Sequence, residues 1–408
     1  MRESSLSTQL LTYSRGKHLF LLCFVTAFLF VKNSPLFLAG QFVAEDAFFF
    51  YTTAYNKDFF EAISTPYAGY LHVLPMILAE LLWNVPFAVL PWVNHLFALT
   101  ICVALLSWLY TPYCRSLIPS DNIRFGFVLL IAATPYQPNL GMLLGLHWYL
   151  TFFVGLLFFG QLPKTRTDVL CLSLVCVLCA WSAPATIVCI PLALYRYWSH
   201  RRQSNRLIPL SFSVASVVNL MVTAFIFKPL SSQPEFANPI VALQATFLMA
   251  HEGVFFRSFL GVGFTSFLSP LVSLALKLVL IFGFIIYLYQ NRSEKHIYLG
   301  LAFIGTGLLI LLLTMFRGFQ SAMIVESGVS FSPRYLTTPT FFALAGVGIL
   351  FAPKVEEWLK DNRLKAYGCC GGYLVLLLGL VWQAPPLHGE RPLAEAFPHS
   401  EKAALFAQ

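Results

Sequence analysis

Two adjacent carboxylates, Glu45 and Asp46, stand in the stretch GQFVAEDAFFFYTTAYN, between a hydrophobic segment and a run of aromatic residues. A carboxylate in a partly desolvated pocket can act as a general base that removes a proton from an attacking hydroxyl group. The same residues could instead cap a helix over AFFFYTTAYN, because acidic side chains are favourable at a helix N-terminus. The choice between these interpretations depends on the elements that position the pair.

Other motifs with a known chemistry are missing from the sequence. All nine cysteines lie in or beside apolar segments, and none is spaced with a histidine as a metal-binding pair. The sequence also has no Walker motif, no Rossmann glycine pattern and no H-E-x-x-H motif. The acidic pair is therefore the strongest candidate for a chemical function.

The chain that carries this pair is strongly apolar. Hydrophobic residues make up 58% of its 408 residues and charged residues 11%, and its mean hydropathy is +0.73. Soluble domains contain about 25% charged residues, so this composition excludes an ordinary soluble domain. Repeated apolar segments of about 17 to 25 residues are long enough to cross a bilayer as helices. We therefore expect an all-α, polytopic transmembrane helical bundle.

We expect about eleven membrane crossings. The segments that predict them are 18–38, 88–110, 125–138, 145–160, 168–182, 184–198, 207–227, 267–290, 297–316, 334–352 and 367–384. Arg15 and Lys17 precede the first segment, but no small-residue cleavage site follows it, so a retained helix is expected instead of a signal peptide. Residues 57–86 contain three prolines and are expected to form interfacial helices instead of a crossing.

Basic residues predict the orientation of these helices. With a cytoplasmic N-terminus, the short inner loops hold most of the 26 Lys and Arg residues, including the four arginines of RYWSHRRQSNR. Counting residues 71–86 as a crossing would move this cluster outside, against the positive-inside rule. The acidic pair then faces outward. The predicted transmembrane domain, residues 1–384, has large outer segments at 39–87 and 228–266, and a short extracytoplasmic tail follows at 385–408.

The order of these motifs resembles the polytopic GT-C glycosyltransferases, which include protein O-mannosyltransferases and lipid A aminoarabinose transferases. In that class an acidic pair follows the first helix, and a segment of the type HPPL or KPPL lies further along the first outer loop. AEDAFFF and TPYAGYLHVLP are the counterparts here, and WSAPATIVCIPLALYRYW and SPRYLTTPTFFALAGVGIL are similar to later stretches of the family. The chain departs from the family in two ways: the pair is Glu-Asp where Asp-Glu is common, and Val73 follows His72 where the family has a double proline.

This resemblance implies an enzyme, an inverting glycosyltransferase that moves a sugar from a polyprenyl-phosphate donor to an envelope glycan, lipid or protein acceptor. One carboxylate would take the proton of the acceptor hydroxyl as it attacks the anomeric carbon. Asp46 is the expected base, with Glu45 as its neighbour or substitute. A second acid is not needed, because a lipid phosphate departs readily once its charge is met. The pair could also hold a divalent cation, but no third oxygen ligand is assigned.

Several further residues are expected to bind the donor phosphate or the substrate. A lipid phosphate favours Arg, Lys or His donors, and Arg can bind it through two hydrogen bonds. The expected binding residues are His72, Lys277, Arg317, Arg334, Tyr335, His147 and Trp148. The alternative is snorkelling of the cations to the interface and a place for Trp148 in the aromatic belt. Lys277 stands inside an apolar segment, where an ionisable group usually faces a cavity or a partner.

Two other classes of membrane protein stay open. A glycan polymerase or ligase would use arginines and a histidine in a large late outer loop, but the loop 317–333 is short. A transporter or flippase would place charges at the midplane on broken helices, whereas the acidic residues here cluster at the outer surface. The expected partners are the lipid-linked sugar, its acceptor and membrane lipids, with no nucleic acid. A bacterial inner membrane suits this design, and the endoplasmic reticulum is the alternative.

Overall fold

A computed structural model describes most of the chain. The described residues are 15–34, 37, 42, 46–67, 69–134, 141–200, 203–227, 238–257, 269–317 and 333–361. Within them the fold is all-α, with 14 α-helices and one isolated β-bridge between Tyr67 and Tyr70. The predicted helix 367–384 and the tail 385–408 lie outside the described residues.

Five helices in the described part are long and apolar enough to cross a membrane. They are Leu90–Tyr110, Ser204–Phe225, Leu271–Gln290, Lys295–Phe316 and Thr337–Trp358. Each falls on one of the segments that the sequence predicts as a crossing. Since about 20 apolar helical residues match the hydrocarbon thickness of a bilayer, the chain has the features of a multi-pass membrane protein.

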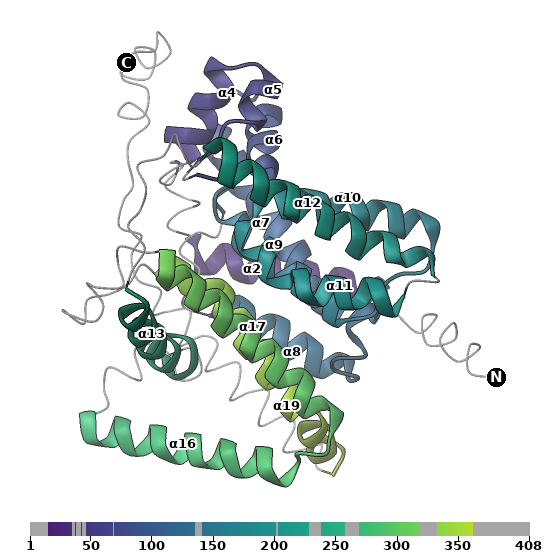
Figure 1. Cartoon of the computed structure of the whole chain (residues 1–408), viewed down its shortest axis with the longest axis vertical. Helices are drawn as coiled ribbons and strands as arrows, with labels where there is room; N and C mark the ends of the chain where they lie inside the picture. The colour runs from purple at the N-terminus through teal and green to yellow at the C-terminus, as the bar shows by residue number, and fades with distance from the viewer. Residues whose placement is uncertain are drawn as a thin grey trace. The chain divides into compact units, whose positions relative to one another are not determined.

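The chain divides into two compact units. One unit, which we call the acidic-pair unit, contains Leu19–Trp108 and Asn139–Gln233; the other, the late-helix unit, contains Leu109–Pro138 and Pro234–Pro385. The helices of the acidic-pair unit (Figure 1) are α2 (Arg15–Lys32, of which it holds the part from Leu19), η1 (Asp46–Tyr51), α4 (Thr52–Asn56), α5 (Phe59–Ile63), α6 (Val73–Leu82), α7 (Leu90–Ser107), α9 (Leu146–Phe159), α10 (Arg166–Ser182), η4 (Pro184–Cys189), α11 (Ile190–Ser199), η5 (Ser204–Arg206), α12 (Leu207–Val222) and η6 (Thr223–Phe227).

Short helices occupy the region that was expected to be interfacial. The longest of them, α6, has ten residues and so extends for about 15 Å, roughly half of the hydrocarbon thickness of a bilayer. Long and tightly packed helices follow. All but the last residue of α9 are buried, and α10 runs beside α12, where the Asn219 side chain donates a 2.8 Å hydrogen bond to the carbonyl oxygen of Ala180.

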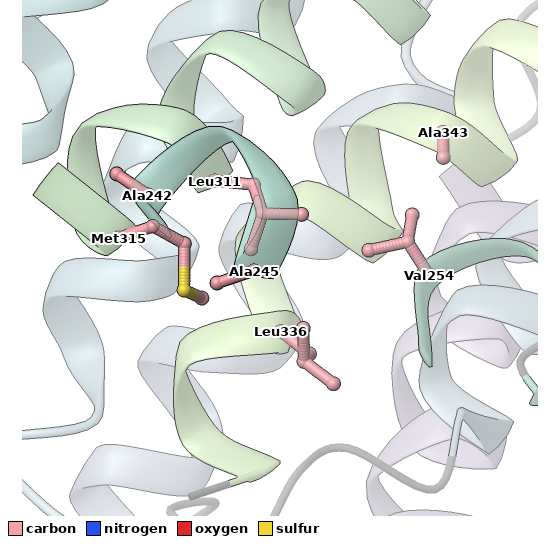
Figure 2. Close-up of a cluster of buried hydrophobic side chains, with 7 residues drawn as sticks. All are labelled: Ala242, Ala245, Val254, Leu311, Met315, Leu336 and Ala343. Atoms are coloured by element: carbon pink, nitrogen blue, oxygen red, sulfur yellow. The ribbon is translucent and has the colours of Figure 1, made fainter. Parts of the chain in front are cut away.

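The late-helix unit packs around a core of small and branched side chains. Its helices are η3 (Pro112–Cys114), α8 (Asp121–Ala133), α13 (Pro239–Leu248), η8 (Met249–Arg257), α16 (Pro270–Gln290), α17 (Lys295–Arg317), η9 (Pro333–Leu336) and α19 (Thr337–Asp361), and η2 (Trp108–Tyr110) follows α7 at its boundary. Figure 2 shows one cluster of this core, formed by Ala242, Ala245, Val254, Leu311, Met315, Leu336 and Ala343. The predicted outer segment 228–266 therefore contains a helix, α13, that packs against α17.

Several predicted helix boundaries are wrong by a few residues, for identifiable reasons. α8 begins at Asp121 instead of residue 125, because the Ser120 side chain accepts a hydrogen bond from the backbone N–H of Ile123 and caps the helix. The predicted end of α19 at residue 352 is wrong, because the helix continues through Pro353 to Asp361. Proline cannot donate an N–H group, so the Ile349 carbonyl oxygen loses its helical partner, and the Tyr287 hydroxyl group donates a 2.6 Å hydrogen bond to the neighbouring Leu350 carbonyl oxygen.

Glycines allow α17 and α19 to approach closely. A Cβ atom placed on Gly300 of α17 would lie 2.8 Å from the carbonyl oxygen of Gly346, and one on Gly346 of α19 would lie 2.6 Å from that of Gly300. Small residues at such crossings are typical of packed membrane helices, because backbone contact replaces the hydrophobic effect as a source of stability.

Replacing Gly300 with alanine is expected to destabilise the protein by about 1 to 3 kcal/mol, because the added methyl group overlaps the α19 backbone. Gly305 lies on the same helix, and a Cβ atom there meets nothing within 4 Å. Gly305→Ala is therefore a matched control, and it should be neutral or stabilise by up to about 1 kcal/mol. Unfolding of the purified variants in detergent measures both effects. Equal changes in the two variants would contradict the close packing.

Candidate functional site

The Asp46 carboxylate is the centre of a buried polar cluster. It is the first residue of η1, and its side chain is 0% exposed. Its Oδ2 atom accepts hydrogen bonds from the Leu143 N–H at 2.8 Å and the Asn94 side-chain amide at 2.9 Å, and its Oδ1 atom accepts one from the Leu144 N–H at 3.2 Å. One side chain thus connects η1 to α7 and to the turn that precedes α9.

These partners exclude the interpretation of Asp46 as a local helix cap. A helix cap accepts hydrogen bonds from N–H groups two or three residues further along the chain. The partners of Asp46 are 48, 97 and 98 residues away. In the described structure Asp46 is therefore a long-range tertiary contact and does not cap the helix that follows it.

Burial changes the acidity of this carboxyl group. Removal from water raises the pKa of Asp46 to about 6, and the hydrogen bonds from Leu143, Asn94 and Leu144 and the nearby His95 oppose that rise. A carboxyl group with this pKa is mostly ionised at neutral pH but is a better proton acceptor than an exposed aspartate. That combination is typical of a general base.

Two other buried residues extend the cluster away from Asp46. The Tyr51 hydroxyl group donates a 2.9 Å hydrogen bond to Asn94 Oδ1, and both side chains are 0% exposed. Tyr51, Asn94 and Asp46 thus form a continuous hydrogen-bonded chain from η1 to α7 and back to η1. Such a fully satisfied network fixes the positions of its members.

The turn at residues 141–145 is held by side chains on both sides. Gly141 has a φ of 87°, a conformation that favours glycine, and its carbonyl oxygen accepts a 2.7 Å hydrogen bond from His95 Nδ1. The Leu144 carbonyl oxygen accepts one from His147 Nδ1. Because a carbonyl can only accept, both rings carry a proton on Nδ1 in this arrangement. The turn therefore places two N–H groups at Asp46 and two carbonyls at histidines.

Aromatic rings and histidines surround the first loop next to this turn. The His72 ring lies 5.8 Å from the His147 ring and 5.7 Å from the Phe50 ring, between centroids. The Tyr70 ring lies 4.6 Å from that of His72, and the Trp148 ring 4.1 Å from that of His147. We call these five residues the histidine-aromatic cluster. Its His72 and His147 side chains are 2% and 6% exposed.

A separate contact fixes His72 in this cluster. His72 immediately precedes α6, and the backbone N–H of Leu74 in the first turn donates a 2.8 Å hydrogen bond to the Ser182 hydroxyl group at the end of α10. Ser182 is 0% exposed. It belongs to the WSAP stretch, so two motifs that are 108 residues apart meet here.

The structure therefore brings together part of the predicted site. Asp46, His72, His147 and Trp148 all belong to the acidic-pair unit and are linked by the contacts above. Glu45 lies outside the described residues. The remaining predicted residues belong to the late-helix unit.

In the late-helix unit, Lys277 is half-buried in the middle of α16, and Tyr335 packs partly buried against the core cluster. Arg317 is the last residue of α17 and Arg334 lies in η9; their side chains are not among the described ones. The role of these four residues in phosphate binding remains a prediction.

Sequence reasoning missed Tyr51, Asn94 and His95. A signal for two of them was present, because Asn94 and His95 are adjacent polar residues in the first turns of an apolar helix, where polar side chains are costly without a partner. The pattern could not identify the partners. Among the described residues no group of three or more His, Cys, Asp or Glu side chains could hold a metal ion.

Comparisons with known protein families, curated proteins and solved structures find no match for this chain. The fold defines the class as an all-α protein with the features of a multi-pass membrane protein.

The pKa of Asp46 predicts a specific dependence of stability on pH. The folded value of about 6 lies above the ordinary 3.8, so the folded chain binds this proton more tightly than the unfolded chain. The contribution of this proton to the free energy of unfolding is fully present below about pH 4 and is lost as the pH rises through 6. The loss is about 3 kcal/mol for a pKa shift of about two units. The stability of the wild type relative to Asp46→Asn should therefore decline over this range in detergent unfolding experiments.

Asp58→Asn provides the control for this prediction. Asp58 is exposed, and its carboxylate caps α5 by accepting a 2.9 Å hydrogen bond from Glu61, a role that asparagine fills equally well. Because Asp46 is intact in this variant, its stability relative to Asp46→Asn should decline in the same range as that of the wild type. Parallel pH curves for the wild type and Asp46→Asn would show that Asp46 is not the buried titrating group.

Proposed function

We propose that the protein is a membrane glycosyltransferase that moves a sugar from a polyprenyl-phosphate donor to an envelope glycan, lipid or protein acceptor. The observation that carries the proposal is the buried Asp46 carboxylate, whose pKa is raised to about 6 and which is connected through the 141–145 turn to the histidine-aromatic cluster. The substrate class comes from the resemblance of the motif order to GT-C glycosyltransferases. The chemistry needs one base, and Asp46 is the candidate with the fitting acidity.

The proposed reaction is a single displacement at the anomeric carbon. The acceptor hydroxyl oxygen forms the new glycosidic bond as the bond from the anomeric carbon to the donor phosphate breaks, and its proton passes to Asp46. The polyprenyl phosphate leaves with the bonding electron pair. Among the described residues Oδ1 of Asp46 accepts one hydrogen bond and Oδ2 accepts two, so Oδ1 has the greater remaining capacity to accept this proton.

The histidine-aromatic cluster supports a place for the donor. Histidine donates hydrogen bonds to sugar hydroxyl or phosphate oxygens, and the flat face of Trp148 offers a surface for a sugar ring. Lys277, Arg317, Arg334 and Tyr335 are proposed to meet the phosphate charge. The proposal includes about eleven crossings, interfacial helices in the first outer loop, and a bacterial inner membrane as the location.

A transporter for lipid-linked sugars is the second candidate. A buried carboxyl group that binds and releases a proton near pH 6 is also what a proton-coupled transporter uses. The two functions differ in what Asp46 does: a transferase without its base forms no product, whereas a transporter without its proton site leaves every glycan bond intact. A covalent product therefore separates them.

The test compares envelope glycans and glycolipids by mass spectrometry in cells that lack the protein and carry wild-type or variant copies at equal levels. Loss of one defined sugar is expected in cells without the protein and in cells with Asp46→Asn, with a decrease of at least about 100-fold, since a general base contributes roughly 10²- to 10⁴-fold. Asp58→Asn, in the same loop, should restore the sugar.

Each other outcome of this comparison has a defined meaning. If Asp46→Asn restores the sugar fully, Asp46 is not the base, and Glu45→Gln becomes the next variant. If no glycan changes in any strain while the protein is present, the transferase proposal is wrong and transport becomes the leading function.

The proposed topology places the first loop outside and the arginine-rich loop inside. Asn56 and Gln203 are both exposed, so a cysteine at either position would be accessible from its own side of the membrane. In intact cells a membrane-impermeant maleimide should label Asn56→Cys well above the parent protein, and Gln203→Cys only after permeabilisation. The reverse pattern would place Asp46 in the cytoplasm and overturn the use of an outward-facing donor.

A further inference from the structure

In the hydrogen-bonded chain of Tyr51, Asn94 and Asp46, each donor points toward Asp46: Tyr51 donates to Asn94, and Asn94 donates to Asp46. An ionised carboxylate can only accept hydrogen bonds, so Asn94 must turn its NH₂ group toward Asp46 Oδ2, 2.9 Å away. The amide oxygen of Asn94 then faces Tyr51, whose hydroxyl group must donate across 2.9 Å. If the Asn94 amide turned over, two oxygens would face each other in a buried site. The ionised carboxylate therefore sets the orientation of the Asn94 amide, and the Tyr51 hydroxyl group stabilises that orientation by donating to the amide oxygen.

The chain also distinguishes the two oxygens of the carboxylate. Oδ2 is held by Asn94 and by the Leu143 N–H, whereas among the described residues Oδ1 accepts only from the Leu144 N–H, at the longest of the three distances. A carboxylate held firmly at one oxygen cannot rotate about its Cβ–Cγ bond without breaking both contacts. The less saturated oxygen is thereby kept in one direction.

We propose that Asn94 is the positioning residue of the base, holding Asp46 ionised and presenting its Oδ1 atom to the acceptor hydroxyl group, with Tyr51 stabilising the Asn94 amide by donating to its oxygen. This inference rests on the proposed function, because Asn94 can position a base only if Asp46 is one. It adds two residues to the reaction that contact the base and not the substrate.

Few titratable groups among the described residues lie near Asp46. The titratable groups that face it are His95 from α7 and Tyr51 from η1; from α9, His147 contacts the carbonyl of Leu144, whose N–H donates to Asp46. Asn94 donates to the charged form of the carboxyl group and so lowers its pKa. Removing this donor should raise the pKa of Asp46, and the ionised fraction near neutral pH should fall.

The direct test is an infrared titration of the full-length protein in a detergent without carbonyl groups. A protonated carboxyl group has a C=O band that histidine and tyrosine do not contribute, and its absence in Asp46→Asn assigns the band to Asp46. For Asn94→Leu the midpoint of this band should move upward by about one to two pH units, the effect of losing one hydrogen bond to a charged group. Tyr51→Phe, which removes one oxygen atom, should give a smaller upward shift.

Asn219→Leu is the matched control. Asn219 is also a buried asparagine in the acidic-pair unit, and its side chain donates to Ala180 instead of Asp46. Its replacement removes a hydrogen bond of 2.8 Å and should leave the midpoint of Asp46 unchanged. An equal shift in Asn219→Leu would mean that general loosening of the fold, and not Asn94, determines the titration, and would overturn the inference.

A second measurement connects the titration to the reaction. An outer-face base equilibrates with the medium, so cells with Asn94→Leu should form little of the glycan at pH 6 and regain it at pH 8, with about a tenfold change for each unit below the new pKa. Should Asn94→Leu leave the infrared midpoint unmoved while Asp46→Asn still abolishes the glycan, the positioning role is wrong and the transferase proposal stands. Should Asp46→Asn restore the glycan, the base assignment fails, whatever the infrared result.

Discussion

The free energy required to bury a carboxylate governs the arrangement of the acidic-pair unit. An ionised aspartate without partners would be strongly unfavourable in a site that is 0% exposed. Three hydrogen bonds compensate Asp46, and they can do so only because α7 and the 141–145 turn lie against η1. The carboxylate and the packing of these elements therefore depend on each other. These hydrogen bonds offset only part of the desolvation, so the pKa of Asp46 stays raised, and the raised pKa makes the carboxylate a candidate general base.

Side chains also form hydrogen bonds with the backbone around Asp46 where regular secondary structure does not supply all of them. The backbone of α9 donates hydrogen bonds to the Leu143 and Gly145 carbonyl oxygens of the 141–145 turn, and His95, His147 and Asp46 pair with other polar groups of the turn. Ser182 does the same for the first turn of α6. In a chain this apolar each unsatisfied backbone group would be costly, so these side chains contribute to the stability of the irregular backbone. These are also the places where residues could meet a substrate.

The late-helix unit illustrates a different source of order. Its helices are held by backbone proximity at Gly300 and Gly346 and by the Tyr287 hydroxyl group at the turn preceding Pro353. Neither contact requires a net hydrophobic gain from water, and both remain effective in lipid. The unit contains the cations proposed to meet the donor phosphate, whereas the proposed base lies in the acidic-pair unit.

The sequence alone determined the class of the protein, because hydropathy and helix length are sums over neighbouring residues. It predicted the all-α, multi-pass character and the positions of most helices, and it singled out Asp46 and His72. It could not predict that α19 continues through Pro353, or that Asp46 bonds with Asn94, Leu143 and Leu144 instead of capping the next helix. The partners of Asp46 lie 48 to 98 positions away and meet it only after the helices pack, and no local pattern in the sequence records such a meeting.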